Sequence, residues 1–205
     1  MRVFAKMMGL AGMVMGAGVA SAAITGVTGQ TTWLGSAPLN CTPGGLVGPN
    51  AFAWDEQQGI NVAGVPCDMV NNPATNFTAI LGTVTGLVDS HFIHFEPNTG
   101  SQIVNGTVTF SGKIRGVMFR QPFLDISDAP LGSPGTAYPT GYPFRGLNVS
   151  SMFSINNNVL SFHFVGPMPT ADLLQLRVLT EHVPAPGGAA LLGLGGLVAA
   201  RRKRG

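Results

Sequence analysis

Histidine and carboxylate side chains are the first residues of this 205-residue chain whose types and spacing could do chemistry. His91 and His94 are three positions apart, and in a strand such residues point to opposite faces, so they cannot chelate one metal ion together. His94, Glu96 and His163 could supply two imidazoles and one carboxylate if another strand brought His163 close. Histidines with ordinary hydrogen-bond partners are the simpler interpretation, and we predict neither a metal nor a cofactor.

Aspartates offer a second possible site, for calcium. Asp125 and Asp128 lie in a long connection and, with Asp68 or Asp89, could present oxygen ligands to Ca²⁺. The sequence contains neither an EF-hand loop nor an RTX repeat, and aspartates often cap turns. Turn capping is therefore the favoured interpretation.

Catalytic arrangements are hard to assemble from this sequence. Asp55 and Glu56 are adjacent carboxylates, but neighbours in sequence usually diverge, so they do not imply a glycosidase pair. The chain has no GxSxG, HExxH or GxxxxGK[ST] motif. We predict that the protein is not an enzyme, and a secreted hydrolase is the weaker alternative.

Aromatic residues with polar neighbours could stack on sugar rings. The candidates are Trp33, Trp54, Tyr138 and Tyr142, and Trp54 is the best of them because acidic and amide residues follow it directly. A carbohydrate contact formed by Trp54, Tyr138 and Tyr142 is therefore one hypothesis. Burial of these rings in a core is the competing interpretation.

Cys41 and Cys67 are the only cysteines. In an exported protein two cysteines are by default a disulfide, which would stabilise the fold by roughly 3–4 kcal/mol on the chain-entropy model. Two free thiols or a metal pair are the alternative. We predict the disulfide.

Short runs rich in Val, Ile, Thr and Phe alternate with Gly, Pro, Asn and Ser through residues 23–182, and long helical periodicity is absent. This spacing predicts an all-β fold, a single antiparallel β-sandwich of jelly-roll-like type. Asn156–Asn158 reads as a hairpin turn. The predicted strands are Ala23–Thr32, Gly59–Val62, Phe77–Val84, His91–Phe95, Ile103–Phe110, Lys113–Phe119, Leu147–Phe153, Val159–Val165 and Leu174–Thr180.

Two stretches rich in proline and glycine are predicted as loops. They are Pro38–Gly48 and Gln121–Tyr142, and within the second Asp125–Pro130 could form a short helical turn. A structureless connection of that length is uncommon in a compact domain and is often functional.

Charge is distributed unevenly along the chain. Residues 23–183 carry five Lys and Arg against all nine acidic residues, a net charge of −4. Nucleic-acid binding needs a clustered basic face, so this composition argues against nucleic acid as a partner. The other six cations lie in the two ends of the chain.

The N-terminal end has the three parts of a secretory signal peptide. Arg2 and Lys6 form the positive region, Met7–Val19 is an uncharged apolar run, and Ala20-Ser21-Ala22 fits the cleavage rule. The apolar run is too short to span a bilayer. We predict a signal helix over residues 1–22 that signal peptidase removes before Ala23.

The C-terminal end combines prolines, an uncharged stretch and a basic cluster. Val183-Pro184-Ala185-Pro186 precedes an Ala, Leu, Gly and Val run from Gly187 to Ala200, and Arg201-Arg202-Lys203-Arg204 follows. An apolar stretch closed by cations is a stop-transfer arrangement. A helix over this run would be about 21 Å long, short for a permanent span of the bilayer.

This order of parts resembles the PEP-CTERM protein-sorting signal, which pairs a Pro-Glu-Pro-like motif, a short transmembrane helix and an Arg-rich tail with an N-terminal signal peptide. Residues 183–205 match it, with Ala185 in place of the central Glu. The resemblance implies transient anchoring in the inner membrane, cleavage near Pro184–Pro186 by an exosortase-type transpeptidase, and delivery to the cell surface or extracellular matrix. A single-span tail anchor is the alternative.

The prediction that follows is a non-enzymatic, exported surface or matrix protein with a structural or adhesive role. A carbohydrate-binding module for exopolysaccharide is the alternative function.

Overall fold

The structure is a computed structural model that describes residues 23–98, 100–166 and 172–184. The predicted signal peptide, residues 1–22, lies outside these ranges. So does most of the predicted sorting signal, including Ala185, Pro186, Arg201, Arg202, Lys203 and Arg204. No helix of the described part is long and apolar enough to cross a membrane.

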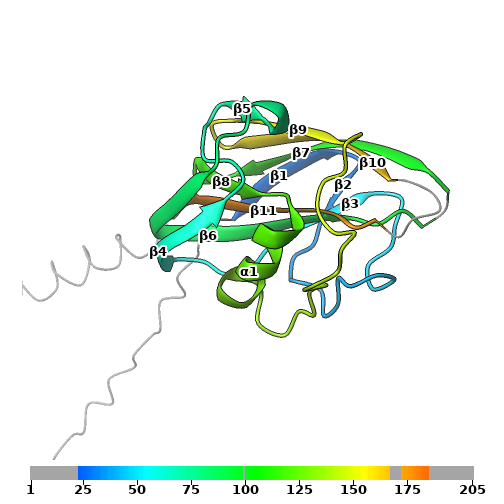
Figure 1. The fold of residues 1–205 in the computed structure, drawn as a ribbon, viewed down its shortest axis with the longest axis horizontal. Helices are drawn as coiled ribbons and strands as arrows, with labels where there is room; N and C mark the ends of the chain where they lie inside the picture. Colours follow the sequence, from blue (N-terminus) through cyan, green and yellow to red (C-terminus); the bar gives the residue numbers. More distant parts are fainter. Residues whose placement is uncertain (1–22, 99, 167–171, 185–205) are drawn as a thin grey trace, which may run out of the picture. The chain divides into compact units, whose positions relative to one another are not determined.

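The fold consists of two β-sheets and one short α-helix (Figure 1), which confirms the all-β prediction. The first sheet, sheet A, is antiparallel throughout, and its strand order is β1-β7-β10-β9-β5. Its strands are β1 (Ile24–Gly29), β7 (Gln102–Phe110), β10 (Val159–Gly166), β9 (Met152–Asn156) and β5 (Ala74–Thr75).

The second sheet, sheet B, has the order β2-β3-β6-β11-β8, and β4 pairs with the first half of β6. All its pairs are antiparallel except β2 with β3, which is parallel. Its strands are β2 (Thr31–Trp33), β3 (Ala51–Asp55), β4 (Ile60–Cys67), β6 (Gly82–Phe95), β8 (Ile114–Met118) and β11 (Leu174–Glu181).

The main core lies between the two sheets, because each contributes the inward half of its alternating side chains. Sheet A contributes Val104, Val108 and Phe110 of β7, in which buried and more exposed residues alternate. Sheet B contributes residues of the same kind from β6 and β11, among them Ile93 and Leu176.

A second apolar layer covers the opposite face of sheet B. The helix α1 (Gln121–Leu131) and the loops around it pack there, below the sheets in the view of Figure 1. Trp54 of β3 and Phe92 of β6 point into this layer, where they meet Leu124 and Leu131 of α1. Both faces of the central strands of sheet B are therefore buried.

Several predicted elements differ from the structure. The sequence predicts no strand at Ala51–Asp55, where the structure has β3. The two strands predicted at Phe77–Val84 and His91–Phe95 are replaced by one continuous strand, β6, which follows a short 3-10 helix at Asn76–Thr78. The segment Gln121–Leu131 is a helix rather than a loop, since a proline in the first turn is compatible with helix formation. The predicted turn is correct: Asn157, with φ of 56°, joins β9 to β10.

Candidate functional site

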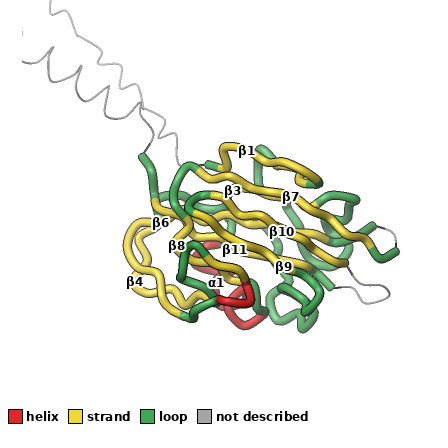
Figure 2. The backbone as a smooth tube through the Cα atoms, turned by 90° about the horizontal axis from the view of Figure 1, so that it is seen from above, coloured by secondary structure: helices red, strands yellow, loops and turns green. Residues whose placement is uncertain are grey.

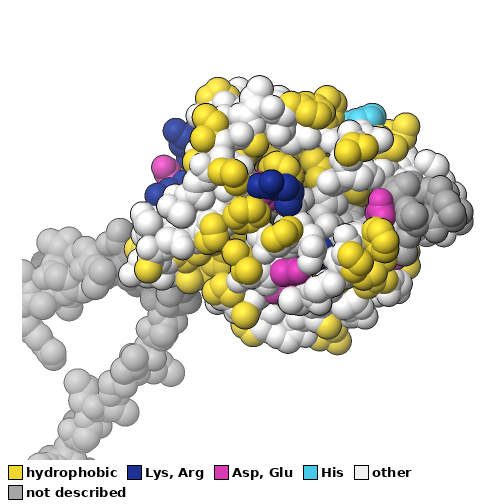
Figure 3. Space-filling model, viewed as in Figure 1, with side chains coloured by type: hydrophobic (Ala, Val, Ile, Leu, Met, Phe, Trp, Pro, Cys, Tyr) yellow, Lys and Arg dark blue, Asp and Glu magenta, His cyan; other side chains and the backbone are white. Residues whose placement is uncertain are grey.

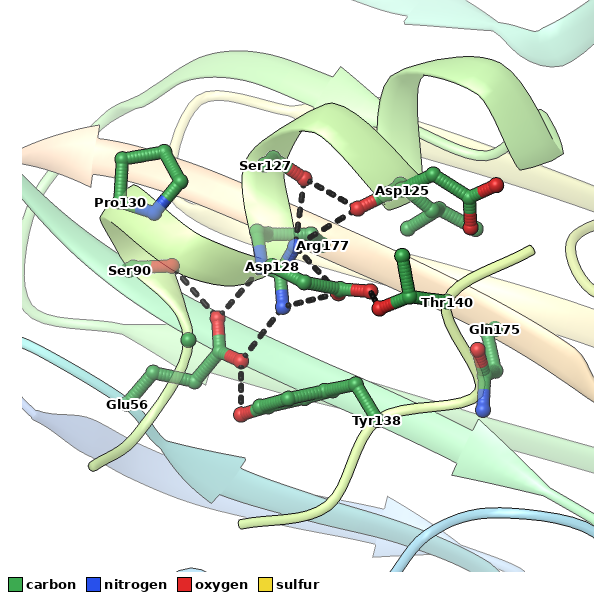
Figure 4. Close-up of polar contacts among 12 residues, drawn as sticks. Glu56, Ser90, Asp125, Ser127, Asp128, Pro130, Tyr138, Thr140, Gln175 and Arg177 are labelled. Carbon is green, nitrogen blue, oxygen red and sulfur yellow. Dashed lines mark hydrogen bonds and ion pairs between the residues drawn. The ribbon is translucent and has the colours of Figure 1, made fainter. Parts of the chain in front are cut away.

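Arg177 is the centre of the most elaborate group of polar contacts in the described residues (Figure 4). It lies in the middle of β11 and, like Gln175, points to the α1 side of sheet B, and its side chain is fully buried. The guanidinium carbon lies 4.9 Å from the ring centre of Phe92 and 5.1 Å from that of Tyr138. Two aromatic faces thus hold the cation in place.

Carboxylates from two other segments complete the surroundings of Arg177. Glu56, just after β3, accepts hydrogen bonds from Nε at 2.7 Å and Nη2 at 2.9 Å, a bidentate pair. Asp128 of α1 accepts from Nη1 and Nη2, each at 3.1 Å. Ser127 Oγ, 2.5 Å from Nη1, accepts a further bond. All five guanidinium donors therefore face α1 and Glu56.

A second buried arginine, Arg145, shares the carboxylates of α1. Its Nη1 lies 2.8 Å from Asp125 Oδ1 and 2.6 Å from Asp128 Oδ2, and its Nε donates to Gln175 Oε1 at 2.9 Å. Asp128 thus bridges two arginines that are far apart in the sequence. We call Glu56, Asp125, Asp128, Arg145 and Arg177 the arginine network.

The spacing of residues along α1 determines which of its side chains reach the arginine network. Leu124, Ser127 and Leu131 are the buried positions of the helix, and they lie on one face at intervals of three and four. Asp125 and Asp128 flank that face, which places both carboxylates against the arginines. The network therefore fastens α1 and the connection that follows it onto sheet B.

The pKa shifts of Arg177 and Tyr138 are consistent with a network in which the charged and polar groups are paired. Burial alone would lower the pKa of Arg177, but the Glu56 and Asp128 carboxylates more than compensate, and the pKa is raised. Burial and the neighbouring Glu56 raise the pKa of Tyr138, whose hydroxyl donates to Glu56 Oε1 at 2.5 Å. Tyr138 therefore stays neutral, and Arg177 stays charged. These protonation states suit a network that holds α1 on sheet B, and they do not suit groups that exchange protons with a substrate.

A second polar group lies between the two sheets and has the connectivity of a hydrolase triad. His91 Nδ1 lies 2.6 Å from Asp55 Oδ1, and His91 Nε2 lies 3.0 Å from Thr180 Oγ1. The Thr180 hydroxyl, however, is fully buried, and the His91 ring packs on Phe110 with ring centres 4.6 Å apart. A substrate cannot reach this hydroxyl, so the group joins β3, β6 and β11 of sheet B, and Asp55 also accepts from Ile24 N of β1 in sheet A at 3.0 Å.

The residues considered for metal binding do not come together. His94 is buried against Leu46 and Gln175, whereas His163 lies on the outer face of sheet A beside Asn105. Asp68 accepts from the backbone of Phe119 and Arg120, and no group of three His, Cys, Asp or Glu in the described ranges could hold a metal ion. Asp125 and Asp128, considered for calcium, bind arginines instead.

The predicted disulfide is wrong, because Cys41 and Cys67 are free and buried. Cys41 Sγ lies 3.4 Å from the carbonyl oxygen of Ala137, next to the arginine network. Cys67 Sγ lies 3.6 Å from the carbonyl oxygen of Val65, at the end of β4. Each sulfur therefore has its own apolar surroundings within the second layer.

Both thiols should be inert in the folded protein. Burial raises the pKa of each to about 12, and the thiolate is the reactive form. We expect iodoacetamide to leave Cys41 and Cys67 unmodified in the native protein and to modify both in denaturant without a reductant, as read by mass spectrometry. Modification of the denatured protein only after reduction would show instead that the disulfide exists.

The predicted carbohydrate contact is also not formed. Trp54 is fully buried beside Phe92, with ring centres 5.0 Å apart. Tyr138 is half-buried and bonded through its hydroxyl to Glu56 and Ser133, and Tyr142 is half-buried against Phe144. Trp54, Tyr138 and Tyr142 therefore do not form one exposed stacking surface.

Most acidic side chains of the described residues are turned inward. Asp55, Glu56, Asp68, Asp89, Glu96, Asp125 and Asp128 all have hydrogen-bond partners within the fold. Burial raises the pKa of Glu96, although the Gly44 amide opposes that shift. The exposed surface is consequently almost uncharged, and the space-filling view has few charged side chains on the face that it shows (Figure 3).

Comparison with protein-family models, curated proteins and solved structures gives no match to this chain.

Proposed function

We propose that this chain is an exported, non-enzymatic protein of the cell surface or extracellular matrix, with a structural or adhesive role. Residues 23–182 form its ectodomain, a β-sandwich of jelly-roll-like type. A signal peptide over residues 1–22 directs export, and residues 183–205 act as a PEP-CTERM-like sorting signal that an exosortase-type peptidase cleaves after transient anchoring in the inner membrane.

The observation that carries this proposal is that the first and last strands of the described domain meet at one turn. Ala23 N donates to Ser111 Oγ at 3.1 Å, and Ser111 N donates to the carbonyl oxygen of Ala23, also at 3.1 Å. Glu181 N donates to the carbonyl oxygen of Lys113 at 2.8 Å. The two ends of the described domain, Ala23 and Glu181, therefore both lie at the turn Ser111–Lys113 between β7 and β8.

The boundaries of the regular structure also support the proposal. The first strand begins at Ile24, one residue after the proposed cleavage site, and the last strand ends at Glu181, one residue before Val183-Pro184. Cleavage at both places would leave every strand of the two sheets intact. The nearly uncharged surface suits a neutral, hydrated matrix.

Mass spectrometry of the mature protein from its own cells tests this proposal. We expect an N-terminus at Ala23 and a C-terminus near Pro184–Pro186 that lacks Arg201–Arg204. A variant with these four cations replaced by glutamine should remain unprocessed, because the stop-transfer signal is gone. The matched control, Lys113→Gln with Arg115→Gln, changes cations of the domain and should be processed normally. A mature chain that still ends in Arg-Arg-Lys-Arg-Gly would contradict the proposal.

Carbohydrate binding is the second candidate function, and a different surface from the predicted one favours it. The outer face of sheet A combines exposed hydroxyl groups with a complete lack of charged residues in its five strands.

A further inference from the structure

Five hydroxyl residues form a straight row across the outer face of sheet A, one from each strand. The register pairs Thr28 with Thr107, Thr107 with Ser161, Ser161 with Ser154, and Ser154 with Thr75. Figure 2 shows four of these strands, β1, β7, β10 and β9, side by side in that order. We call these five residues the hydroxyl row.

The hydroxyl row faces away from the core. Its strand neighbours Val108, Leu160 and Phe153 are buried between the sheets, and successive side chains of a strand point to opposite faces. Thr28 and Ser154 are exposed, and the other three residues of the row are half-buried. Thr28 Oγ1 and Thr107 Oγ1 lie 2.7 Å apart, which confirms that both point to the same side.

A shallow groove runs along the β9 end of the row. Its volume is about 380 Å³, and its lining combines the hydroxyl residues Thr75, Ser154 and Ser161 with the apolar residues Met152, Phe153 and Phe162 and with His163. The volume falls within the range of small-ligand sites. Exposed Met152 adds an apolar contact, and the His163 ring is held by Asn105 Oδ1 at 2.7 Å from Nδ1.

The charge of this face restricts what can bind. The five strands of sheet A contain no Asp, Glu, Lys or Arg, so an anionic ligand would have no counter-charge there. Hydroxyl groups both donate and accept hydrogen bonds, as the hydroxyls of a sugar do. A neutral, hydroxyl-rich partner therefore fits this face better than a phosphate or a uronic acid.

The distance between neighbouring strands further restricts the shape of the ligand that this face can bind. Neighbouring strands lie about 4.8 Å apart, so the row repeats a hydroxyl at that interval over five strands. An extended β-linked glucan advances by nearly the same distance for each sugar. We propose that the hydroxyl row binds a neutral, extended β-linked polysaccharide whose chain crosses the strands, with one sugar over each strand.

This inference deepens the proposed matrix role and rests on it, because it names the chemistry that would hold the domain in the matrix. Pairing of two copies through the same face is less favoured. The cores of protein interfaces are rich in aromatic and other large apolar residues, and this face offers only Ile103 and Met152 as exposed large apolar side chains.

The test is binding of the full-length protein, purified in detergent, to insoluble cellulose, with granular starch as a helical, α-linked comparison. Binding is measured as the fraction depleted from solution over a range of protein concentrations. We expect saturable binding to cellulose and none to starch. The triple variant Thr107→Val, Ser161→Ala and Ser154→Ala should bind about ten-fold more weakly or worse, because three hydrogen-bonding groups are lost.

The matched control is Thr83→Val with Thr85→Val, which removes two exposed hydroxyl residues from β6 of the other sheet and should bind as the unmodified protein does. Circular dichroism checks that each variant is folded. If the triple variant does not fold, the single change Ser154→Ala at an exposed position should still weaken binding measurably.

Three results would overturn the inference. These are no cellulose binding by the unmodified protein, an equal loss in the β6 control, or concentration-dependent dimerisation in detergent that the triple variant abolishes. The assay uses purified protein and does not depend on export, so its failure is distinguishable from failure of the sorting proposal, which the mass of the mature chain reports.

Discussion

Arg177→Met is expected to lower the free energy of unfolding by about 3–5 kcal/mol, because it leaves the buried Glu56 carboxylate without its cation. The Glu56 side chain is fully buried and forms its ion pair with Arg177, whereas the nearly buried Asp128 keeps its ion pair with Arg145. Met has a volume suited to the space between Phe92 and Tyr138, so the loss reflects charge rather than a cavity. Urea unfolding followed by circular dichroism measures the change.

Arg115→Met on the neighbouring strand β8 is the matched control for this prediction. Arg115 has no ion-pair partner among the described residues, so its replacement should change the stability by less than about 0.5 kcal/mol. The double variant Arg177→Met with Glu56→Gln should recover part of the loss, since it also removes one buried charge. Equal stabilities for the Arg177 and Arg115 variants would contradict the role of the arginine network.

Acidification should destabilise the fold through His94. Burial lowers the pKa of His94 from 6.5 to about 4, with a smaller contribution from the positive charge of Arg145. Between these values the unfolded state binds more protons than the folded state, so stability falls as the pH is lowered from 6.5 towards 4. At pH 4 the loss from this residue amounts to about 3 kcal/mol.

His94→Gln isolates this effect, because glutamine retains hydrogen-bonding groups but does not titrate. We expect the variant to be somewhat less stable at neutral pH and to lose less stability than the unmodified protein between pH 6.5 and 4. His163→Gln, on the outer face of sheet A, is the matched substitution at a site away from His94. Parallel profiles for His94→Gln and the unmodified protein would contradict the assignment.

The strand pattern was predictable wherever one face of a strand is buried and the other exposed. β7 and β10 alternate in this way, and both were predicted nearly to the residue. In β6 the alternation fails because residues 88–95 are buried on both faces. The polar residues Asp89 and Ser90 led to the prediction of two separate strands. In the structure they lie within β6, where His182 and Glu56 form hydrogen bonds with them.

The arginine network could not be predicted from spacing, since Glu56 and Arg177 are 121 positions apart. One local signal was available: Arg177 is the single charged residue in Leu174–Leu179, a run made mostly of Leu and Val. A lone arginine in a strand that is buried on both faces needs buried anions as partners. The identity of these carboxylates depends on how α1 packs against sheet B. The helix itself was predicted as a loop because it contains Pro122 and Pro130.

The position of both Ala23 and Glu181, the ends of the described domain, at the turn Ser111–Lys113 also determines how the domain responds to force. Tension applied between Ala23 and Glu181 would enter at neighbouring points, next to the same turn. Such a pull opens the β1–β7 and β8–β11 ladders from their ends, one hydrogen bond after another, rather than shearing whole strands at once. The domain would therefore be mechanically weak while tethered through both ends, and release of either tether would remove the load from its core.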